Sequence, residues 1–348
     1  MRTMWTLPGA GRRSVRLLTA FSFAGLLIGC GPQTSGSART PSTASAPSVS
    51  AVANVPSPKK PDASACSADR WCVVSVPKQV TLSAVWGASP SDVWAAGEAG
   101  TLLHWNGSAW TEVASGTSSA LRALAGTSTT NVWAAGLDGT LLHFDGTSWS
   151  ATQKSGSPWS FATGPNERPI YALFATPKQL WAGGSGARSF DGTKWSEPHH
   201  ASHLPTMALW AADPQNVWAV GLQGTVTRWE GHHWVRTGND MGPNFLGVWG
   251  SAPNDVWVVG SAGTIVHFSG ESRANVASGT SNDLHALLGF RANDIWAVGD
   301  QGTILHWQGS AWSSSASPSE RALLGIWGAS AQDLWVVGEN GIVLRRQG

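Results

Sequence analysis

The chain has 348 residues, of which only 12% are charged, about half the share of a typical soluble domain, while glycine (41) and tryptophan (22) are abundant. Four of the 22 basic residues precede residue 30, which leaves 18 basic against 21 acidic residues in the remainder. A net charge of about −3 there excludes a nucleic-acid-binding or anionic-membrane-binding surface as the main function.

Residues 1–29 are predicted to be a lipoprotein signal peptide. Arg12 and Arg13 form a basic start, and the apolar stretch 17–28 that follows is too short to span a bilayer as a permanent helix. It ends at Gly29-Cys30, which resembles a bacterial lipobox and predicts lipidation of Cys30. The alternative is an ordinary signal peptide with a chance cysteine, and the paired arginines also resemble a twin-arginine export signal.

The residues after the signal peptide predict where the protein resides. Gly31 stands where an aspartate would retain a lipoprotein at the inner membrane. In an organism with an outer membrane, this resemblance implies a cell outer membrane lipoprotein, periplasmic or surface-exposed. Residues 30–65 are rich in Ser, Pro and Ala with almost no large apolar groups, so we expect a disordered tether to the lipid in the membrane.

Cys66 and Cys72 flank a short segment at the end of this tether. In an oxidising compartment, two cysteines this close are expected to form a disulfide, which leaves Cys30 for the lipid. A metal site made by two thiols alone is disfavoured. The disulfide would staple the point where the tether meets the fold.

The rest of the chain is an internal repeat. A phrase of the form Asp/Asn-Val-Trp-Ala-Val-Gly recurs seven times, followed by Gly-Thr-Leu-Leu-His-Trp, and its Trp residues are 39, 48, 37, 39, 39 and 39 residues apart. A period near 40 residues, built from short apolar alternations without a helical pattern, is typical of propeller blades. We therefore predict an all-β fold, a seven-bladed β-propeller over residues 66–348. The repeated residues are Trp94, Trp133, Trp181, Trp218, Trp257, Trp296 and Trp335.

Each repeat predicts four short strands. In the first repeat these span 82–87, 93–97, 101–105 and 109–113, with a glycine-bounded hairpin between the second and the third. The third repeat is the least regular, and in the fifth repeat Arg273 stands near the place of the fourth-strand tryptophan.

The two ends of the chain predict how the ring closes. The seventh repeat stops at Gly348 without a fourth strand, while residues 70–74 resemble an unclaimed one whose Trp71 matches Trp110 and Trp149. We expect the N-terminal strand to complete the last blade. Closure of this kind removes two open sheet edges that would otherwise favour aggregation.

Two turns carry a family resemblance. Asp145 and Asp191 each begin an Asp-Gly-Thr turn that ends in a tryptophan, and these turns resemble Asp-box (BNR-type) hairpins, in degenerate form. Residues 70–348 are similar to the WD40/YVTN/BNR-like repeat proteins of bacterial envelopes, which include the photosystem II assembly-factor-like propellers. The resemblance implies the propeller fold, and we expect the propeller to be monomeric. It implies little about function, because propellers host many activities.

Sialidases share Asp-box propellers, so they are the enzyme class to weigh. Their chemistry needs a tyrosine nucleophile with a glutamate partner and three arginines. The only tyrosine, Tyr171, lies in an apolar strand run and is interpreted as a packed aromatic at a blade-core position. The arginines share no common blade position. We therefore predict no enzymatic activity and no cofactor.

Two groups of histidines are candidate metal ligands. The histidines that recur at one blade position lie too far apart to share a metal, whose ligand bonds are about 2 Å long, and are interpreted as a duplicated polar position. The three histidines within 199–203 are a weak candidate for a transition metal, and a solvated polar loop is favoured, so no metal is predicted. The first group is His104, His143, His267 and His306, with Arg228 and Arg345 in the same position, and the second is His199, His200 and His203, followed by His232 and His233.

The connection over 153–169 is the insertion that breaks the period. It contains Trp159 among Gly, Ser and Pro, followed by Asn166, Glu167 and Arg168. Loops on rigid scaffolds often carry binding function, and a tryptophan there could anchor a partner or stack on a sugar. The alternative, slightly favoured, is a tolerated surface insertion with Trp159 packed against a blade.

The sequence thus favours a non-catalytic envelope lipoprotein whose propeller is a protein-binding or assembly scaffold. The alternative is a carbohydrate-binding, lectin-like propeller with one glycan site per groove, and a glycoside-cleaving enzyme lacks a recognisable carboxylate pair. A lectin of that kind should repeat an exposed aromatic and identical polar residues in every groove. The connections between repeats differ in length and sequence, which favours one protein partner of the envelope over repeated glycan sites.

Overall fold

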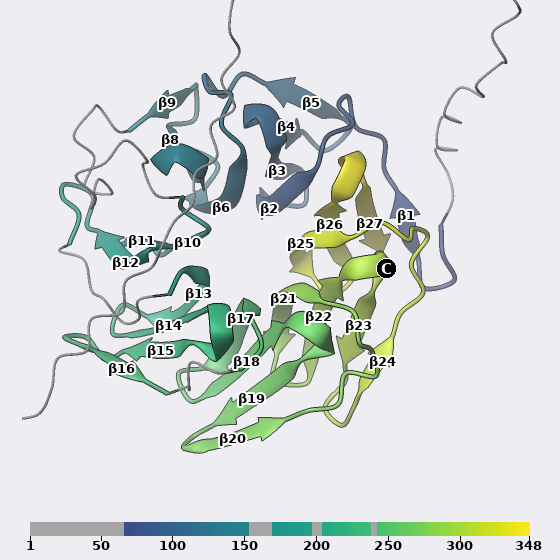
Figure 1. Cartoon of the computed structure of the whole chain (residues 1–348). Coiled ribbons are helices and arrows are strands. Elements are labelled where there is room, and N and C mark those ends of the chain that lie inside the picture. Colours follow the sequence, from purple (N-terminus) through teal and green to yellow (C-terminus); the bar gives the residue numbers. More distant parts are fainter. Residues whose placement is uncertain (1–65, 153–168, 197–203, 238–241) are drawn as a thin grey trace, which may run out of the picture. The chain divides into compact units, whose positions relative to one another are not determined.

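A computed structural model of the chain describes residues 66–152, 169–196, 204–237 and 242–348. These residues form seven antiparallel sheets arranged around one axis (Figure 1). The predicted all-β, seven-bladed propeller is confirmed. Among the described residues, no helix is long and apolar enough to cross a membrane.

Each sheet is one blade, and its strands follow one another outward from the axis. Blade one contains β2 (Leu82–Ser89), β3 (Asp92–Gly97), β4 (Leu102–Trp105) and β5 (Trp110–Val113). Blade two contains β6 (Leu121–Ser128), β7 (Asn131–Gly136), β8 (Leu141–Phe144) and β9 (Trp149–Ala151). Blade three contains β10 (Ala172–Ala175), β11 (Leu180–Gly184) and β12 (Gly186–Phe190), with an isolated bridge from Phe190 to Trp195 in place of a fourth strand.

The remaining blades follow the same plan. Blade four contains β13 (Thr206–Asp213), β14 (Asn216–Gly221), β15 (Val226–Trp229) and β16 (Trp234–Arg236). Blade five contains β17 (Phe245–Ala252), β18 (Asp255–Gly260), β19 (Ile265–Ser269) and β20 (Ser272–Asn275). Blade six contains β21 (Leu284–Arg291), β22 (Asp294–Gly299), β23 (Ile304–Trp307) and β24 (Trp312–Ser314). Blade seven contains β25 (Leu323–Ser330), β26 (Asp333–Gly338), β27 (Val343–Gln347) and the N-terminal strand β1 (Trp71–Val73).

The propeller has two faces that carry different turns. We define the front face as the face on which the first strand of each blade begins. The turns between the second and third strands lie on the same face, because Glu98 N, in the turn of blade one, donates to Thr81 O, just before the first strand, at 2.9 Å. The back face carries the first-to-second and third-to-fourth turns, which meet where Gly107 lies against Ser91. A side chain in a turn or at the end of a strand can therefore be placed on one face from its position in the repeat.

The second-to-third turns are tight because a glycine follows a residue in the left-handed region. In blade one, Ala99 has φ 52° and Gly100 has φ 65°. A Cβ atom on Gly100 would lie 2.0 Å from Thr117 O, so only glycine fits there. The turns are η1 (Glu98–Gly100), η2 (Leu137–Gly139), η3 (Leu222–Gly224), η4 (Ser261–Gly263), η5 (Asp300–Gly302) and η6 (Glu339–Gly341).

The blades are held together by the repeated second-strand tryptophans, all seven of which are buried. Trp257 is 2% exposed, and its ring lies 4.8 Å from the ring of Trp307 and 5.8 Å from that of Trp312 on the next blade. Its indole nitrogen has no hydrogen-bond partner in the described chain. The contact is therefore stabilised by buried apolar area and ring-edge geometry rather than by a hydrogen bond.

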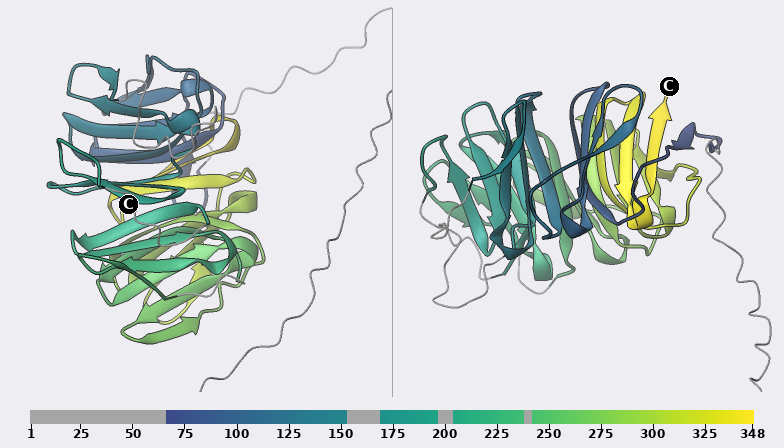
Figure 2. Two further views of the ribbon diagram at one scale, coloured as in Figure 1. Left: turned by 60° about the vertical axis from the view of Figure 1, so that its left-hand side comes forward. Right: turned by 90° about the horizontal axis from the view of Figure 1, so that it is seen from above.

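The N-terminal strand closes the ring as predicted. β1 lies beside the C-terminal strand β27 (Figure 2). The two strands pair antiparallel, with Trp71 opposite Arg346. Trp71 is fully buried, lies edge-on to Trp296 at 5.7 Å, and donates its indole N–H to Ser315 Oγ at 3.1 Å. It occupies in blade seven the position that Trp110 occupies in blade one, so the termini share one blade.

Two local features of the sequence are found in the structure. Arg273 in β20 takes the place of a fourth-strand tryptophan, with its guanidinium 5.7 Å from the ring of Phe268. Cys66, five residues before β1, is joined by a disulfide bond to Cys72 within β1. The bond therefore anchors the described N-terminus at the closing strand.

We predict that Trp257→Ala lowers the free energy of unfolding by about 3–5 kcal/mol, the usual cost of truncating a buried aromatic. Thermal and urea unfolding would measure the loss. Ser150→Ala, at an exposed position of β9, is the control and should leave the free energy of unfolding unchanged. Equal losses for the two variants would contradict the packing role of the second-strand tryptophan.

Removal of the closing strand should open the ring. We expect fragment 74–348 to melt at a lower temperature than fragment 66–348 and to aggregate, because β27 would present an unpaired edge. Thermal melts and light scattering measure both effects. Fragment 31–348 is the control for loss of the tether, and it should melt at the same temperature as fragment 66–348. If fragment 74–348 is as stable and as monodisperse as fragment 66–348, β1 does not close the ring.

Candidate functional site

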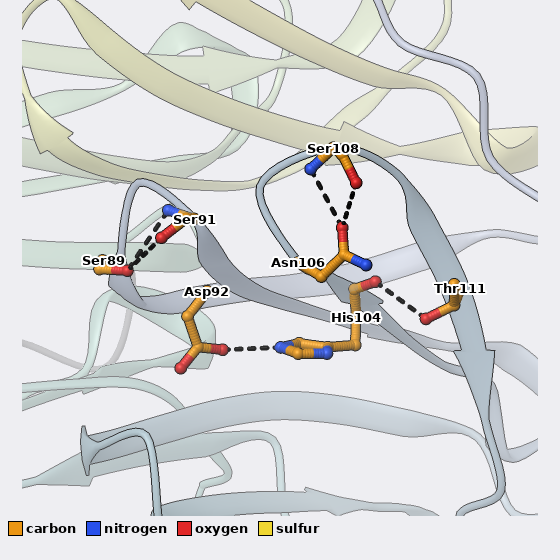
Figure 3. Close-up of polar contacts among 7 residues, drawn as sticks. All are labelled: Ser89, Ser91, Asp92, His104, Asn106, Ser108 and Thr111. Atoms are coloured by element: carbon orange, nitrogen blue, oxygen red, sulfur yellow. Dashed lines mark hydrogen bonds and ion pairs between the residues drawn. The ribbon is translucent and has the colours of Figure 1, made fainter.

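The repeated histidines lie on the back face and are bonded within their own blades. His104 Nε2 is 2.7 Å from Asp92 Oδ1 (Figure 3). The imidazole stacks on Trp94, with the two ring centres 4.2 Å apart. Each histidine therefore links the start of the second strand to the third strand and covers the buried tryptophan. The equivalent pairs are His143 with Asn131 at 2.9 Å, His267 with Asp255 at 2.6 Å and His306 with Asp294 at 2.9 Å.

Arginine takes the same position in two blades. Arg345 binds Asp333 through Nε at 2.9 Å and Nη2 at 3.1 Å, and its guanidinium lies over Trp335 at 4.7 Å. In blade four, Arg228 pairs with Glu230 instead. These side chains cover the repeated tryptophans on the face that a sugar would have to stack on, which argues against one glycan site per groove.

The third-to-fourth turns are locked by side-chain acceptors. Asp145 Oδ1 accepts hydrogen bonds from Thr147 N, Thr147 Oγ1 and Ser148 N at 2.7–3.0 Å. These bonds stabilise the carboxylate and lower the pKa of Asp145 to about 2. In blade one, Asn106 makes the corresponding bonds to Ser108 (Figure 3). The turn therefore works with an amide as well as with a carboxylate.

The described part of the chain offers no ready metal centre: it brings together no group of three or more His, Cys, Asp or Glu side chains that could hold an ion. The weak candidates His199, His200 and His203 lie outside the described residues. His232 and His233, which are described, lie with their rings 4.4 Å apart, and His232 Nδ1 is 3.0 Å from Glu230 O.

The front face carries a position whose side chain differs from blade to blade, as the residues of the second-to-third turns also do. It is the second residue of the first-strand segment, where a register shift interrupts the pairing of the first and second strands in six blades. All seven side chains are half-buried, and the first strands that carry them surround the axis (Figure 1). We call these the axial residues: Ser83, Arg122, Tyr171, Met207, Leu246, His285 and Leu324.

The axial residues divide into a bonded group and an apolar group. Arg122 Nη1 donates to Ser83 Oγ at 3.1 Å, and His285 Nε2 is 2.7 Å from Asp300 Oδ1 in η5. The apolar side chains leave apolar surface open to solvent at the end of a rigid ring, which is where a partner can gain hydrophobic contact. Three of them occupy consecutive blades, three to five, and the fourth is in blade seven: Tyr171, Met207, Leu246 and Leu324.

The interpretation of Tyr171 as a packed core aromatic is corrected by this placement. Ile170 is fully buried and Leu173 is 9% exposed, whereas Tyr171 between them is half-buried at the axial position, just before β10. At the same position of the other six blades, the register shift moves the second residue out of the core alternation. Period-two reasoning over an apolar run could not anticipate such an irregularity.

The predicted binding loop lies largely outside the described residues, including Trp159, Asn166, Glu167 and Arg168. Its flanks are described and attach at the front face beside blade two. Thr152 N donates to Leu141 O at 3.1 Å, and Ile170 N donates to Gly136 O at 2.9 Å. The insertion therefore leaves and rejoins the propeller on the face that carries the axial residues.

Sequence reasoning missed the axial residues. Their signal is present in the repeat: the second-strand tryptophan and the glycine three residues after it recur in all seven repeats, whereas the axial position holds six residue types. The tryptophans and histidines that recur in the sequence are the most visible candidates for a site, but in the structure they are packing residues. The informative positions are those where the repeats differ.

Comparisons with known proteins support the fold. No protein-family model and no curated protein sequence matches the chain. Among solved structures, the chain is similar to YCF48 bound to D1 peptide, with 17% identity, a TM-score of 0.67, and 82% of this chain and 100% of that chain covered. It is also similar to YCF48 from Cyanidioschyzon merolae, with 16% identity, a TM-score of 0.65, and 80% and 99% covered.

A WD40 propeller is similar to about the same degree. The WD40 domain of Doa1 shares 12% identity, with a TM-score of 0.63 and coverage of 80% of this chain and 96% of that chain. Identities this low establish the propeller fold, which the repeat resemblance had implied, and do not transfer function.

The Asp145 turn predicts a pH dependence. A lowered pKa in the folded state contributes stability that is present above the unfolded pKa near 3.9 and is lost as pH falls toward about 2. We expect the stability difference between the unchanged protein and Asp145→Asn to shrink from pH 5 to pH 2, as measured by urea unfolding. Asn106→Asp should introduce the opposite difference over the same range. A difference that does not vary with pH would contradict this role.

Proposed function

We propose that this protein is a non-catalytic envelope lipoprotein whose propeller binds a protein partner at the front face. The observation that carries the proposal is the set of axial residues. They vary from blade to blade, and three consecutive ones, Tyr171, Met207 and Leu246, are apolar and half-buried. A surface that differs from blade to blade suits one asymmetric partner rather than seven copies of one ligand.

The similar structures support a protein partner. One of them is a YCF48 propeller bound to a peptide, and another is the WD40 domain of Doa1, so propellers of this fold include a peptide binder. A rigid ring also favours binding, because little conformational entropy is lost when its preorganised surface meets a partner. The residues that flank the 153–168 insertion, Thr152 and Ile170, lie at the front face, so we add the insertion to the proposal as a second binding element.

The anchor and location belong to the same proposal. Lipidation at Cys30 would hold the chain at the outer membrane, and residues 31–65 would serve as a tether from lipid to propeller. At roughly 5–6 Å × √n for a flexible chain, 35 residues allow an r.m.s. reach of about 30–35 Å. The front face could then meet a partner held in the same membrane or free beside it.

The partner experiment uses fragment 66–348 as bait for detergent-solubilised envelope of the source organism. We expect one stoichiometric protein to be captured. Met207→Asp combined with Leu246→Asp should weaken its binding at least tenfold, because each change places a charge in an apolar contact. The matched control combines Ser91→Asp and Thr129→Asp, at two exposed positions of the back-face turns, and should leave binding unchanged.

Two results would distinguish the alternatives. Polysaccharide captured without protein, and released by free sugar, would establish the lectin-like function in place of the scaffold. If the front-face variant still captures the protein and the back-face control does not, the binding surface lies on the back face and the proposal is wrong. Shortening 153–169 in a further variant tests the insertion separately from the axial residues.

A further inference from the structure

A polar cavity of about 380 Å³ opens on the back face between blades six and seven. Its walls include two arginines, Arg291 at the end of β21 and Arg346 in β27. The amide side chains of Gln308 and Gln332 also line it. It lies on the face opposite the axial residues, so the proposed partner surface does not account for it.

This junction differs from the other six in the residue that covers the second-strand tryptophan. At the other junctions the covering third-strand side chain is aromatic, whereas at this one it is Arg346, with its guanidinium 5.1 Å from the centre of Trp296. The other pairs are Trp94 with Phe144, Trp133 with Phe190, Trp181 with Trp229, Trp218 with Phe268, Trp257 with Trp307, and Trp335 with Trp105. The other six junctions therefore serve as a comparison within the same molecule, and in none of them does an arginine cover the second-strand tryptophan from the next blade.

The second arginine is also specific to this junction. Its side chain is exposed and has no partner among the described residues. An unpaired cation at the rim of a cavity is free to bind an anion without first breaking a bond. Arg291 ends β21, whereas the first strands of the other blades end in Ser89, Ser128, Ala175, Asp213, Ala252 and Ser330.

The guanidinium of Arg346 has donors left over. Nη1 donates to Ala331 O at 2.7 Å, whereas Nε is buried without a hydrogen-bond partner in the described chain. The stacking on Trp296 holds the planar group in one orientation. Because Nη1 is engaged and Nε is buried, Nη2 is the nitrogen that remains to donate to an oxygen in the cavity.

The charges of the site select for a single negative charge. Asp294, which lines the cavity, is already paired with His306 at 2.9 Å. Arg346 also interacts electrostatically with Asp69, a second carboxylate near the site. A phosphate, with close to two negative charges at neutral pH, would add like charge beside Asp294.

We propose that this cavity binds a carboxylate group. The two arginines bind its oxygens, and Gln308 and Gln332 offer amide N–H donors beside them. The volume exceeds that of a carboxylate alone, so the site takes a small carboxylated molecule or an acidic side chain carried by a protein. Both sources present the same chemistry, and the choice of probe separates them.

The test titrates the full mature chain with two carboxylate probes, using calorimetry and NMR of the arginine Nε–H signals. The probes are propionate and the blocked peptide acetyl-Gly-Glu-Gly-amide, with its Gln counterpart and inorganic phosphate as references. We expect saturable carboxylate binding that weakens about tenfold in Arg291→Gln. Arg273→Gln, which removes an exposed arginine of blade five, is the matched control and should not change the affinity.

The outcomes decide both the site and the source. Tighter binding of the Glu peptide than of propionate supports a protein-borne carboxylate, and the reverse supports a small molecule. Equal binding of the Gln peptide, tighter binding of phosphate, or unchanged affinity in Arg291→Gln would overturn the proposal. Arg346→Gln is a second variant, and Arg291→Gln remains decisive if loss of the stacking on Trp296 weakens the fold.

Discussion

The structure depends on one contact made seven times, in which a buried second-strand tryptophan is pressed against the third strand of the next blade. Trp257 shows it in full, between His267 of its own blade at 4.0 Å and Trp307 of the next at 4.8 Å. Its indole nitrogen has no hydrogen-bond partner in the described chain, so apolar burial carries the contact. Because each blade is a thin sheet, these contacts bind the ring together only when the ring is closed, which makes Trp71 in the closing strand as important as any internal tryptophan.

Repetition of this contact separates structure from function. Positions that pack the blades, such as the tryptophans shared by all seven blades and the histidines or arginines over them in six, have little freedom to specialise. Function can therefore be sought where one blade departs from the others. The axial residues depart on the front face, and Arg291 with Arg346 depart on the back face. The variation among the axial residues supports a single protein partner. The two arginines between blades six and seven support a carboxylate-binding site at that junction.

Much of the fold could be predicted because each of the seven repeats carries the same pattern of strands and turns. The spacing of the tryptophans set the number of blades, and the missing fourth strand of the last repeat, together with Trp71, set the mode of closure. The site could not be predicted in the same way. The apolar neighbours of Tyr171 place it in the core by alternation, whereas the structure leaves it half-buried at a position where the other blades have a register shift. Such a shift depends on pairing geometry that period-two alternation does not encode.

The sequence by itself determined the blade count, the strand order within each blade, the tight glycine turns and the strand that closes the ring. These follow from local periodicity and turn chemistry repeated at a fixed interval. Only the tertiary structure decided which repeated residues are packing groups and which face solvent. It also brought Arg291 and Arg346, 55 positions apart in the chain, to one cavity. The physical reason is that a repeat specifies each blade alone, whereas a binding site forms between blades, where side chains from two repeats meet.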